Sequence, residues 1–476
     1  MTTFANLIAG EWTMGTRSVP NVNPSDTTDI IGEAAQATAE EMNQAIEAAA
    51  KAQVGWAQTT PQQRFDILDA IGTEILARKE ELGDLLSREE GKILPEGIGE
   101  VGRAGQIFKF FAGEALRISG ERVESIRPGI EIDMRREPLG VVGLITPWNF
   151  PIAIPAWKIA PALCYGNAVV LKAAEAVPAC AWVLADIIHR AGLPAGVFNL
   201  VNGRGSEIGP VMIDHPKIAG VSFTGSVQTG RSVAQACAKN LKKVQLEMGG
   251  KNPAVVLDDA DLDAAVGACV NSAFFSSGQR CTASSRMIVT EGIYDDFVAA
   301  MTKTVAALKV GDARDGATQI GPVIDARQLE KDLEYVEIAK AEGAKLVCGG
   351  EKLDGPGHYM SPALFIDTAN DMRINQEEVF GPVATIIKAK DYDDALRIAN
   401  ETDFGLSAGI CTTSLKYASH FKAHAKAGMV MVNLPTAGVD YHVPFGGTKG
   451  SSYGSREQGR YAAEFYSVMK TSYTQP

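Results

Sequence analysis

The chain has 476 residues, of which 46% are hydrophobic and 21% are charged, and its formal net charge is -12. This composition is typical of a globular protein of two or three domains, and an acidic surface argues against nucleic acid and anionic membranes as partners. The seven cysteines are widely spaced and there is no run of 18 apolar residues, so we expect a cytoplasmic protein without disulfides, secretion signal or membrane-spanning helix.

Residues 40–111 have a helical pattern, because apolar residues recur every three or four positions between charged ones. Two helix starts are predicted inside this region. Thr38 with Glu41 and Thr60 with Gln63 each match the capping box, in which a hydroxyl and a carboxylate or amide satisfy the first backbone N–H groups.

Short β-branched runs alternate with helical patterns between Gly140 and Met248. The predicted strands are residues 141–146, 168–172, 197–201, 218–223 and 244–246. Most of the stretches between them are long enough for a crossover helix, so we predict a parallel, doubly wound sheet of the Rossmann type that binds a nucleotide.

A second α/β series begins at Gly249. Its predicted strands are residues 254–257, 286–289, 345–347 and 384–387, and its predicted helices are residues 294–308 and 328–342. We therefore assign residues 1–117 and 139–248 to a cofactor-binding domain and 249–445 to a catalytic domain. Residues 118–138 and 446–476 lie outside both of these domains.

Cys281 is the leading candidate for a nucleophile. It follows Gly278 and Arg280 in a small, polar stretch, where the guanidinium is expected to favour the thiolate over the thiol. The alternative is a buried, inert cysteine, which is the better interpretation of the other six.

Two further side chains fit acyl chemistry. Glu247 ends a predicted strand before two glycines, where a partly buried carboxylate would have a raised pKa and could act as a general base. Asn149 follows an apolar strand, and its amide could hydrogen-bond a developing oxyanion together with the backbone N–H of Cys281. A solvated strand-end carboxylate and a turn asparagine are the alternatives.

Phe223, Gly225 and Ser226 follow a predicted strand and open a helix, which leaves free N–H groups for a diphosphate. His420 and His424 stand four residues apart, but no third ligand is apparent, so a solvated helix face is preferred over a metal site. A cysteine hydrolase is disfavoured because none of the six histidines has a recognisable pairing motif.

Taken in chain order, the runs around Asn149, Glu247 and Cys281 resemble the NAD(P)-dependent aldehyde dehydrogenase superfamily, from about Phe4 to the C-terminus. The run from Asn433 to Gly447 and the glycine-rich stretch after it are similar to those of the α-ketoglutaric semialdehyde (2,5-dioxovalerate) dehydrogenases. The implied fold is an aldehyde dehydrogenase-like α/β fold with a cofactor domain, a catalytic domain and, in residues 118–138 and 446–476, a small β-arm for oligomerisation and a C-terminal tail.

The resemblance implies roles for individual residues. Cys281 would be the nucleophile, Glu247 the general base and Asn149 part of the oxyanion hole, with Lys158 and Glu457 as a proton relay. The implied cofactor-binding residues are Thr146, Pro147, Trp148, Lys172, Glu175, Phe223, Gly225, Ser226, Glu378 and Phe380. The implied substrate-binding residues are Arg280, Trp157 and Phe445. The acidic Glu175 would repel a 2′-phosphate, which favours NAD over NADP.

The implied reaction oxidises a small-molecule aldehyde to an acid with hydride transfer to NAD(P), through a thioester on Cys281, in a homodimer or homotetramer. The expected substrate is α-ketoglutaric semialdehyde, with Arg280 the nearest cation in sequence for its carboxylate. Succinic semialdehyde dehydrogenases often have an arginine where this chain has Trp157, which weakens that alternative. A CoA-acylating dehydrogenase and a catalytically idle binding member of the fold are further alternatives.

Overall fold

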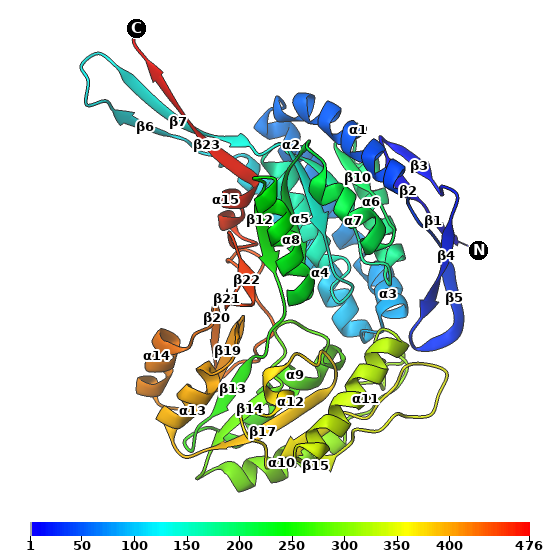
Figure 1. Cartoon of the computed structure of the whole chain (residues 1–476), viewed down its shortest axis with the longest axis vertical. Helices are drawn as coiled ribbons and strands as arrows, with labels where there is room; N and C mark the ends of the chain where they lie inside the picture. Colours follow the sequence, from blue (N-terminus) through cyan, green and yellow to red (C-terminus); the bar gives the residue numbers. More distant parts are fainter. Residues whose placement is uncertain (1) are drawn as a thin grey trace.

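The computed structural model describes residues 2–476, and its largest element is an eight-stranded sheet in the order β22-β12-β11-β8-β9-β10-β2-β3 (Figure 1). Its strands are β2 (Asn6–Ile8), β3 (Glu11–Thr13), β8 (Val141–Ile145), β9 (Ala168–Lys172), β10 (Phe198–Leu200), β11 (Ile218–Thr224), β12 (Lys243–Glu247) and β22 (Ser452–Tyr453). The five central strands are parallel and the outer three are antiparallel to their neighbours. The predicted parallel sheet is therefore confirmed.

Helices cover both faces of this sheet because alternate strand residues point to opposite sides. Val142 and Leu144 pack into one core and Val141 into the other. The first core includes residues of α2 (Pro61–Ala77), α3 (Lys79–Glu90), α4 (Leu94–Ala115), α5 (Ala153–Cys164) and α6 (Pro178–Arg190). The second includes residues of α1 (Ala39–Ala57), α7 (Gly205–Asp214) and α8 (Val227–Lys239).

The two capping boxes that start α1 and α2 are confirmed. The Thr38 hydroxyl accepts from the backbone N–H of Glu41, whose carboxylate accepts from the backbone N–H of Thr38. Thr60 and Gln63 make the same reciprocal pair at α2. Local hydrogen bonds thus fix where both helices begin.

A seven-stranded sheet, in the order β15-β16-β17-β14-β13-β19-β20, forms the second domain. Its strands are β13 (Pro253–Val256), β14 (Arg286–Thr290), β15 (Lys345–Cys348), β16 (Ala363–Ile366), β17 (Val383–Ala389), β19 (Ser407–Cys411) and β20 (Met429–Val432). Only β15 runs antiparallel to its neighbour. Three of these strands, β16, β19 and β20, were not predicted from the sequence.

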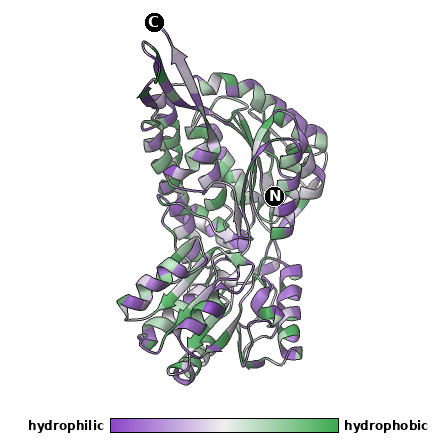
Figure 2. Cartoon of the chain, turned by 60° about the vertical axis from the view of Figure 1, so that its left-hand side comes forward, coloured by the Kyte–Doolittle hydropathy of each residue, from purple (hydrophilic) through white to green (hydrophobic). Residues whose placement is uncertain are grey.

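The second sheet is also covered by helices on both faces. They are α9 (Leu262–Phe274), α10 (Tyr294–Ala306), α11 (Ala326–Ala341), α12 (Arg373–Gln376), α13 (Tyr392–Asn400) and α14 (Leu415–His424). Figure 2 shows hydrophobic residues along the strands, whereas the helices alternate between hydrophobic and hydrophilic residues. This alternation is expected for helices with one buried side.

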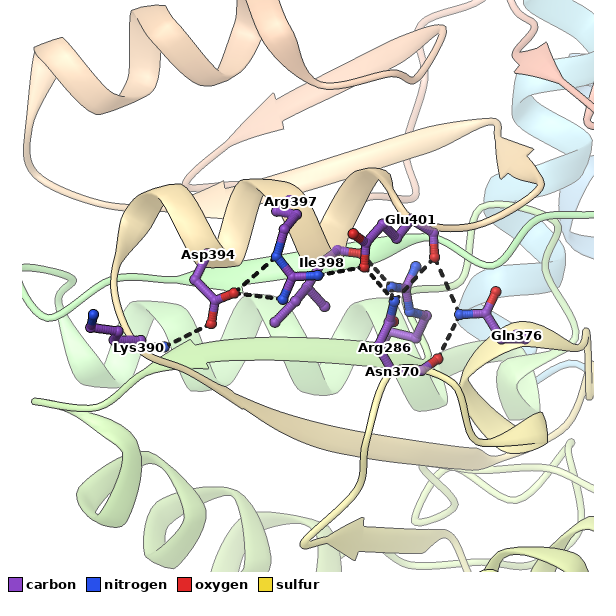
Figure 3. A network of polar contacts seen from close by, with 8 residues as sticks. All are labelled: Arg286, Asn370, Gln376, Lys390, Asp394, Arg397, Ile398 and Glu401. Carbon is purple, nitrogen blue, oxygen red and sulfur yellow. Dashed lines mark hydrogen bonds and ion pairs between the residues drawn. The ribbon is translucent and has the colours of Figure 1, made fainter.

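A buried arginine ties α13 to this sheet. Arg286 on β14 donates from Nη2 to the Ile398 carbonyl at 2.7 Å and to the Asn370 side chain at 2.6 Å (Figure 3). On the outer face of the helix, Arg397 pairs with Asp394 and Glu401. The hydrogen bonds of Arg286 satisfy a charged group that burial would otherwise penalise.

Three smaller sheets complete the fold. One joins β1 (Thr2–Phe4), β5 (Asp26–Ala35) and β4 (Ser18–Asn23), and another joins β18 (Phe404–Gly405) to β21 (Thr448–Lys449). The third is an arm that projects from the first domain (Figure 1). It consists of β6 (Glu121–Glu124), β7 (Glu131–Pro138) and β23 (Ser467–Thr474), in the order β23-β7-β6.

The C-terminal segment returns to the first domain before it reaches the arm. Strand β22 pairs with β12, so that Ser452 lies opposite Glu247. A 3-10 helix (Arg460–Ala462) and α15 (Ala463–Tyr466) then lead into β23. Residues 446–466 therefore contact the cofactor-domain sheet, and the domain limits given above stay a prediction.

Across residues 2–476, no helix combines the length and apolarity that crossing a bilayer requires.

Candidate active site

The chain reaches Cys281 through a strained turn. Ser276 and Ser277 have left-handed φ angles of 53° and 54°, and Gly278 follows with a φ of 68°. A Cβ atom on Gly278 would lie 2.2 Å from the carbonyl oxygen of Gly381, so only glycine allows this contact. Strained backbone of this kind holds functional side chains in fixed positions.

Cys281 lies where two cavities meet. A cavity of about 240 Å³ has Cys281 in its lining together with Arg103, Trp157 and Phe445. A second cavity of about 200 Å³ also has Cys281 in its lining, together with Asn149 and Glu378. The first is called the aldehyde-side cavity and the second the nucleotide-side cavity. One sulfur atom can therefore contact two different ligands.

Arg280 and Cys281 do interact through their charges in the expected direction, but this effect is outweighed. Burial, together with the negative charges of Glu378 and Glu247, raises the pKa of the Cys281 thiol to about 12. The Arg280 guanidinium donates to the carbonyl of Asn271. The resting group is thus a thiol, which must lose its proton before it attacks.

Asn149 reaches the segment that carries Cys281. Its side-chain Nδ2 donates to the Gln279 carbonyl at 3.0 Å, and its own backbone carbonyl accepts from Lys92 at 2.8 Å. An amide nitrogen carries two hydrogens, so the second N–H of Asn149 is left for a ligand in the nucleotide-side cavity, which Asn149 lines.

Glu247 is a buried acid at the end of β12. Burial raises its pKa well above the usual range and the charge of Glu457 adds to this, whereas a hydrogen bond from Ser452 at 2.5 Å opposes it. A Cβ atom on Gly446, which has a φ of 147°, would lie 2.7 Å from Glu247 Oε1. The expected raised pKa of Glu247 is confirmed. Sequence reasoning missed Ser452, because only strand pairing brings it to this carboxylate.

Lys158 and Glu457 form a buried ion pair, with exposures of 0% and 2% for their side chains. Lys158 also donates to the Ser222 hydroxyl at 2.7 Å, and this hydroxyl donates to Gln245 at 2.9 Å. The structure therefore brings these two residues together, and their charges act on the pKa of Glu247 from opposite directions.

A third cavity, of about 660 Å³, continues the nucleotide side across the carboxyl ends of the first sheet. Its lining includes Thr146, Pro147, Trp148, Lys172, Phe223, Gly225 and Ser226. The Ser226 hydroxyl caps α8 by accepting from the backbone N–H of Thr229 at 3.3 Å. Helix starts and strand ends of this kind bind phosphates.

Two buried hydroxyls in this region, those of Thr146 and Thr224, have no hydrogen-bond partner within the described residues. Both residues line the 660 Å³ cavity. Lys172 Nζ lies 3.7 Å from Glu175 Oε1, and this oxygen accepts from the backbone N–H of Gly205 at 2.8 Å. The two unpartnered hydroxyls, and the carboxylate of Glu175 bonded to the lining residue Gly205, fit the diphosphate and ribose of a dinucleotide.

Glu378 and Phe380 line the nucleotide-side cavity opposite Asn149. Glu378 accepts from the backbone N–H of Gly250 at 2.9 Å, and burial raises its pKa. The Phe380 ring meets the Trp148 ring edge to face at 5.5 Å, and Phe380 itself has a left-handed φ of 69°. These side chains are held firmly around the space beside Cys281.

The aldehyde-side cavity contains the three predicted substrate residues and one that sequence reasoning missed. The Trp157 and Phe445 rings pack at 5.3 Å, and Arg280 lies on the same lining. Arg103, on α4, was not predicted. The signal for it was present, because Glu96, Glu100 and Arg103 are spaced to share one helix face.

His420 and His424 are engaged with their neighbours. Tyr392 hydroxyl and His420 Nδ1 lie 2.7 Å apart, and His424 Nδ1 lies 2.8 Å from the His420 carbonyl. In the part of the chain that the structure describes, no group of three His, Cys, Asp or Glu residues is arranged to hold a metal ion.

Comparisons with known proteins agree with this geometry. Residues 12–472 match the aldehyde dehydrogenase family. The chain is 43% identical to the α-ketoglutaric semialdehyde dehydrogenase of Bacillus subtilis (strain 168), over 100% of this chain and 98% of that protein. It is 43% identical to the α-ketoglutarate semialdehyde dehydrogenase of Haloferax volcanii, over 98% of each. A crystal structure of betaine aldehyde dehydrogenase from Staphylococcus aureus with NAD+ has a TM-score of 0.97 and 35% identity, covering 99% of this chain and 95% of that one.

The doubly wound sheet, its strand-end cavity and these matches define an oxidoreductase of the NAD(P)-dependent class. More specifically, the chain belongs to the aldehyde dehydrogenase family, and it acts on small-molecule aldehydes. The predicted family, fold class and enzyme class are confirmed.

Proposed function

We propose that the protein oxidises α-ketoglutaric semialdehyde to 2-oxoglutarate, with NAD+ as the preferred cofactor. The single observation that carries the proposal is the position of Cys281 in the lining of both the aldehyde-side and the nucleotide-side cavities. Two relatives at 43% identity act, by name, on this semialdehyde. The substrate is assigned to this chain on that similarity and on the charged aldehyde-side cavity.

In the proposed reaction, Cys281 passes its proton to a water molecule in the cavity, and its thiolate attacks the aldehyde carbon. The oxygen becomes an alkoxide, which the second N–H of Asn149 stabilises. NAD(P)+ supplies the acceptor for the hydride that leaves this carbon, and a thioester on Cys281 remains. Water then attacks the thioester and loses a proton to Glu247, which releases the carboxylic acid and regenerates the thiolate.

The buried pair of Lys158 and Glu457 is proposed to relay the proton away from Glu247. Both charges act on the pKa of this carboxyl, and Ser222 links the lysine to Gln245. A buried network of this kind can move a proton without exposing Glu247, which is 2% exposed.

The chain's own groups fit a dinucleotide. Thr146 and Thr224 offer unpartnered hydroxyls, the N-terminus of α8 faces the same cavity, and Glu378 and Phe380 line the space nearest Cys281. Glu175 supports the preference for NAD+, because a carboxylate accepts from ribose hydroxyls and repels a 2′-phosphate.

The arm is proposed to join copies of this chain into a dimer or tetramer in the cytoplasm. Its apolar side chains Val123, Ile126, Val468, Met469 and Tyr473 are exposed in the single chain. Exposed apolar residues on a projecting strand support such an interface.

Steady-state rates test the substrate and the cofactor together. The purified enzyme is assayed for NADH and NADPH absorbance with α-ketoglutaric semialdehyde, succinic semialdehyde and butanal. We expect the highest kcat/KM with α-ketoglutaric semialdehyde and NAD+, and 2-oxoglutarate as the product in the absence of CoA. A preference for butanal would contradict the proposed substrate.

A further inference from the structure

The aldehyde-side cavity contains hydrogen-bond donors without acceptors. Arg103 Nε and Trp157 Nε1 are buried, and neither has a partner within residues 2–476. Both residues line the cavity that has Cys281 in its lining. Arg280 Nε, on the same lining, is a third such donor. Buried donors are almost always satisfied, so unpartnered donors beside a nucleophile indicate that a ligand with acceptor oxygens completes them.

One other cation of this cavity, Lys92, already has an anion in contact with it. Lys92 pairs with Glu100 at 2.7 Å, and the other oxygen of Glu100 accepts from the backbone N–H groups of Ile152 and Ala153 at 3.0 Å. The charges of Glu100 and Asp440 also act on the pKa of Arg103, but the oxygens of Glu100 contact Lys92 and the two backbone N–H groups, not Arg103.

Arg280 and Arg103 differ in their surroundings. Glu96 is the charged group that acts most strongly on the pKa of Arg280, and Arg280 Nη2 donates to the Asn271 carbonyl. Arg103 has no carboxylate within 4.0 Å among the described residues, and its one hydrogen bond is from Nη2 to Gln458 at 3.0 Å. Arg280 has no carboxylate within 4.0 Å among these residues either, and its Nε is likewise unpartnered, but Arg280 directly precedes the nucleophile in sequence whereas Arg103 lies on α4.

The position of the Arg103 guanidinium is fixed. It lies over the Trp157 ring, 5.7 Å from the centroid, and Trp157 packs in turn against Phe445. Stacking on an indole and the bond to Gln458 hold the planar group in one orientation. An oriented guanidinium binds a carboxylate more strongly than a mobile one, because less entropy is lost.

We propose that Arg103 binds the carboxylate at the far end of the substrate, with the Trp157 indole N–H beside it, and so selects aldehydes that carry an anionic end. This role rests on the proposed function, because it names the residue that recognises the proposed substrate. It assigns the carboxylate to α4 instead of to Arg280 beside the nucleophile.

The test compares Arg103→Gln with the wild type on a charged and an uncharged aldehyde. We expect kcat/KM for α-ketoglutaric semialdehyde to fall roughly 10- to 100-fold, mainly through KM, while kcat/KM for butanal changes less than about threefold. Arg103→Lys keeps the charge without the planar fork, so it should recover part of the loss. Arg280→Gln is the matched variant on the same cavity and should not lose the charged substrate selectively.

Glutarate provides a readout that does not depend on activity. It should raise the melting temperature of the wild type and of Arg280→Gln but not of Arg103→Gln, whereas NAD+ should protect all three. The response to NAD+ shows that each variant is folded.

The outcomes separate the two proposals. If the wild type prefers α-ketoglutaric semialdehyde and Arg103→Gln keeps that preference, the role of Arg103 is wrong and the proposed function stands. A loss of kcat/KM for α-ketoglutaric semialdehyde, but not for butanal, in Arg280→Gln alone would also contradict the role of Arg103. If the wild type has no preference for an anionic aldehyde, both are wrong.

Discussion

The two cavities that meet at Cys281 are built in different ways. The nucleotide side follows strand ends and turns, with Pro147 after β8, Gly225 after β11 and the start of α8 in its lining. The aldehyde side is lined by side chains from α4 and α5 and by residues 437–445. The shape of the nucleotide-side cavity thus depends mainly on backbone topology, and the shape of the aldehyde-side cavity depends mainly on individual side chains.

This difference explains how one fold serves several aldehydes. The Staphylococcus aureus betaine aldehyde dehydrogenase structure with NAD+ superposes on this chain with a TM-score of 0.97 at only 35% identity. A cofactor cavity shaped by the backbone is expected to tolerate such sequence change, whereas substrate preference is expected to depend on side chains such as Arg103, Trp157 and Phe445. Substitutions at either cavity, or at the sulfur atom between the two cavities, test this difference.

The largest effect is expected at the junction of the two cavities. Cys281→Ala removes the nucleophile, so aldehyde oxidation should fall by at least about 10⁴-fold. NAD+ binding, measured by calorimetry, should be retained, because Cys281 is one residue of the nucleotide-side lining and does not line the 660 Å³ cavity proposed for the diphosphate and ribose. Cys348→Ala is the control, since Cys348 is a part-exposed thiol on β15 and should leave the rate unchanged. Retained turnover in Cys281→Ala would exclude the thioester route.

Asn149→Ala should have the next largest effect. The loss of one donor to the oxyanion is expected to lower kcat by about 10²- to 10³-fold, with little change in the KM for NAD+. Rapid-mixing measurements of the first turnover would place the loss in the acylation step. Asn240→Ala is a control on an exposed helix end. A loss confined to the KM for NAD+ would instead assign Asn149 to cofactor binding.

The five central parallel strands of the first sheet could be predicted from the sequence, but their order in the sheet was not predicted, and neither was the full lining of the aldehyde side. Each run from 141–146 to 244–246 carries its own pattern of β-branched residues, so local periodicity was sufficient. Arg103 and Ser452 reach the site only through the packing of α4 and the pairing of β22. No local sequence pattern predicts those long-range contacts.

The pKa of Cys281 shows a related limit of local reasoning about Arg280. Its place next to Cys281 in sequence suggested that it acts on the thiol, but its guanidinium bonds to Asn271, nine residues back. Meanwhile burial and two acids set the pKa of Cys281. Side chains that are adjacent in sequence need not act on the same group.

On the nucleotide side, Glu175→Gln should change the choice of cofactor. The amide keeps an acceptor for the N–H of Gly205 but removes the charge that repels a 2′-phosphate. The ratio of kcat/KM for NADP+ to that for NAD+ should therefore rise roughly tenfold. Glu207→Gln, at an exposed carboxylate paired with Arg17, is the control. An unchanged ratio would place cofactor choice elsewhere in the 660 Å³ cavity.

The smallest effect is expected from Ser452→Ala, and it concerns pH. Ser452 donates to Glu247 and lowers its pKa, whereas burial and Glu457 raise it, so the variant should have a still higher pKa for this carboxyl. A general base works as the carboxylate, and its activity is lost as the pH falls through its pKa. The acidic limb of the kcat profile should therefore lie at higher pH in Ser452→Ala, with the alkaline plateau changed by less than about threefold. Ser455→Ala, three residues further along the same segment, should leave the limb in place. A limb that moves to lower pH would mean that another group limits the hydrolysis of the thioester.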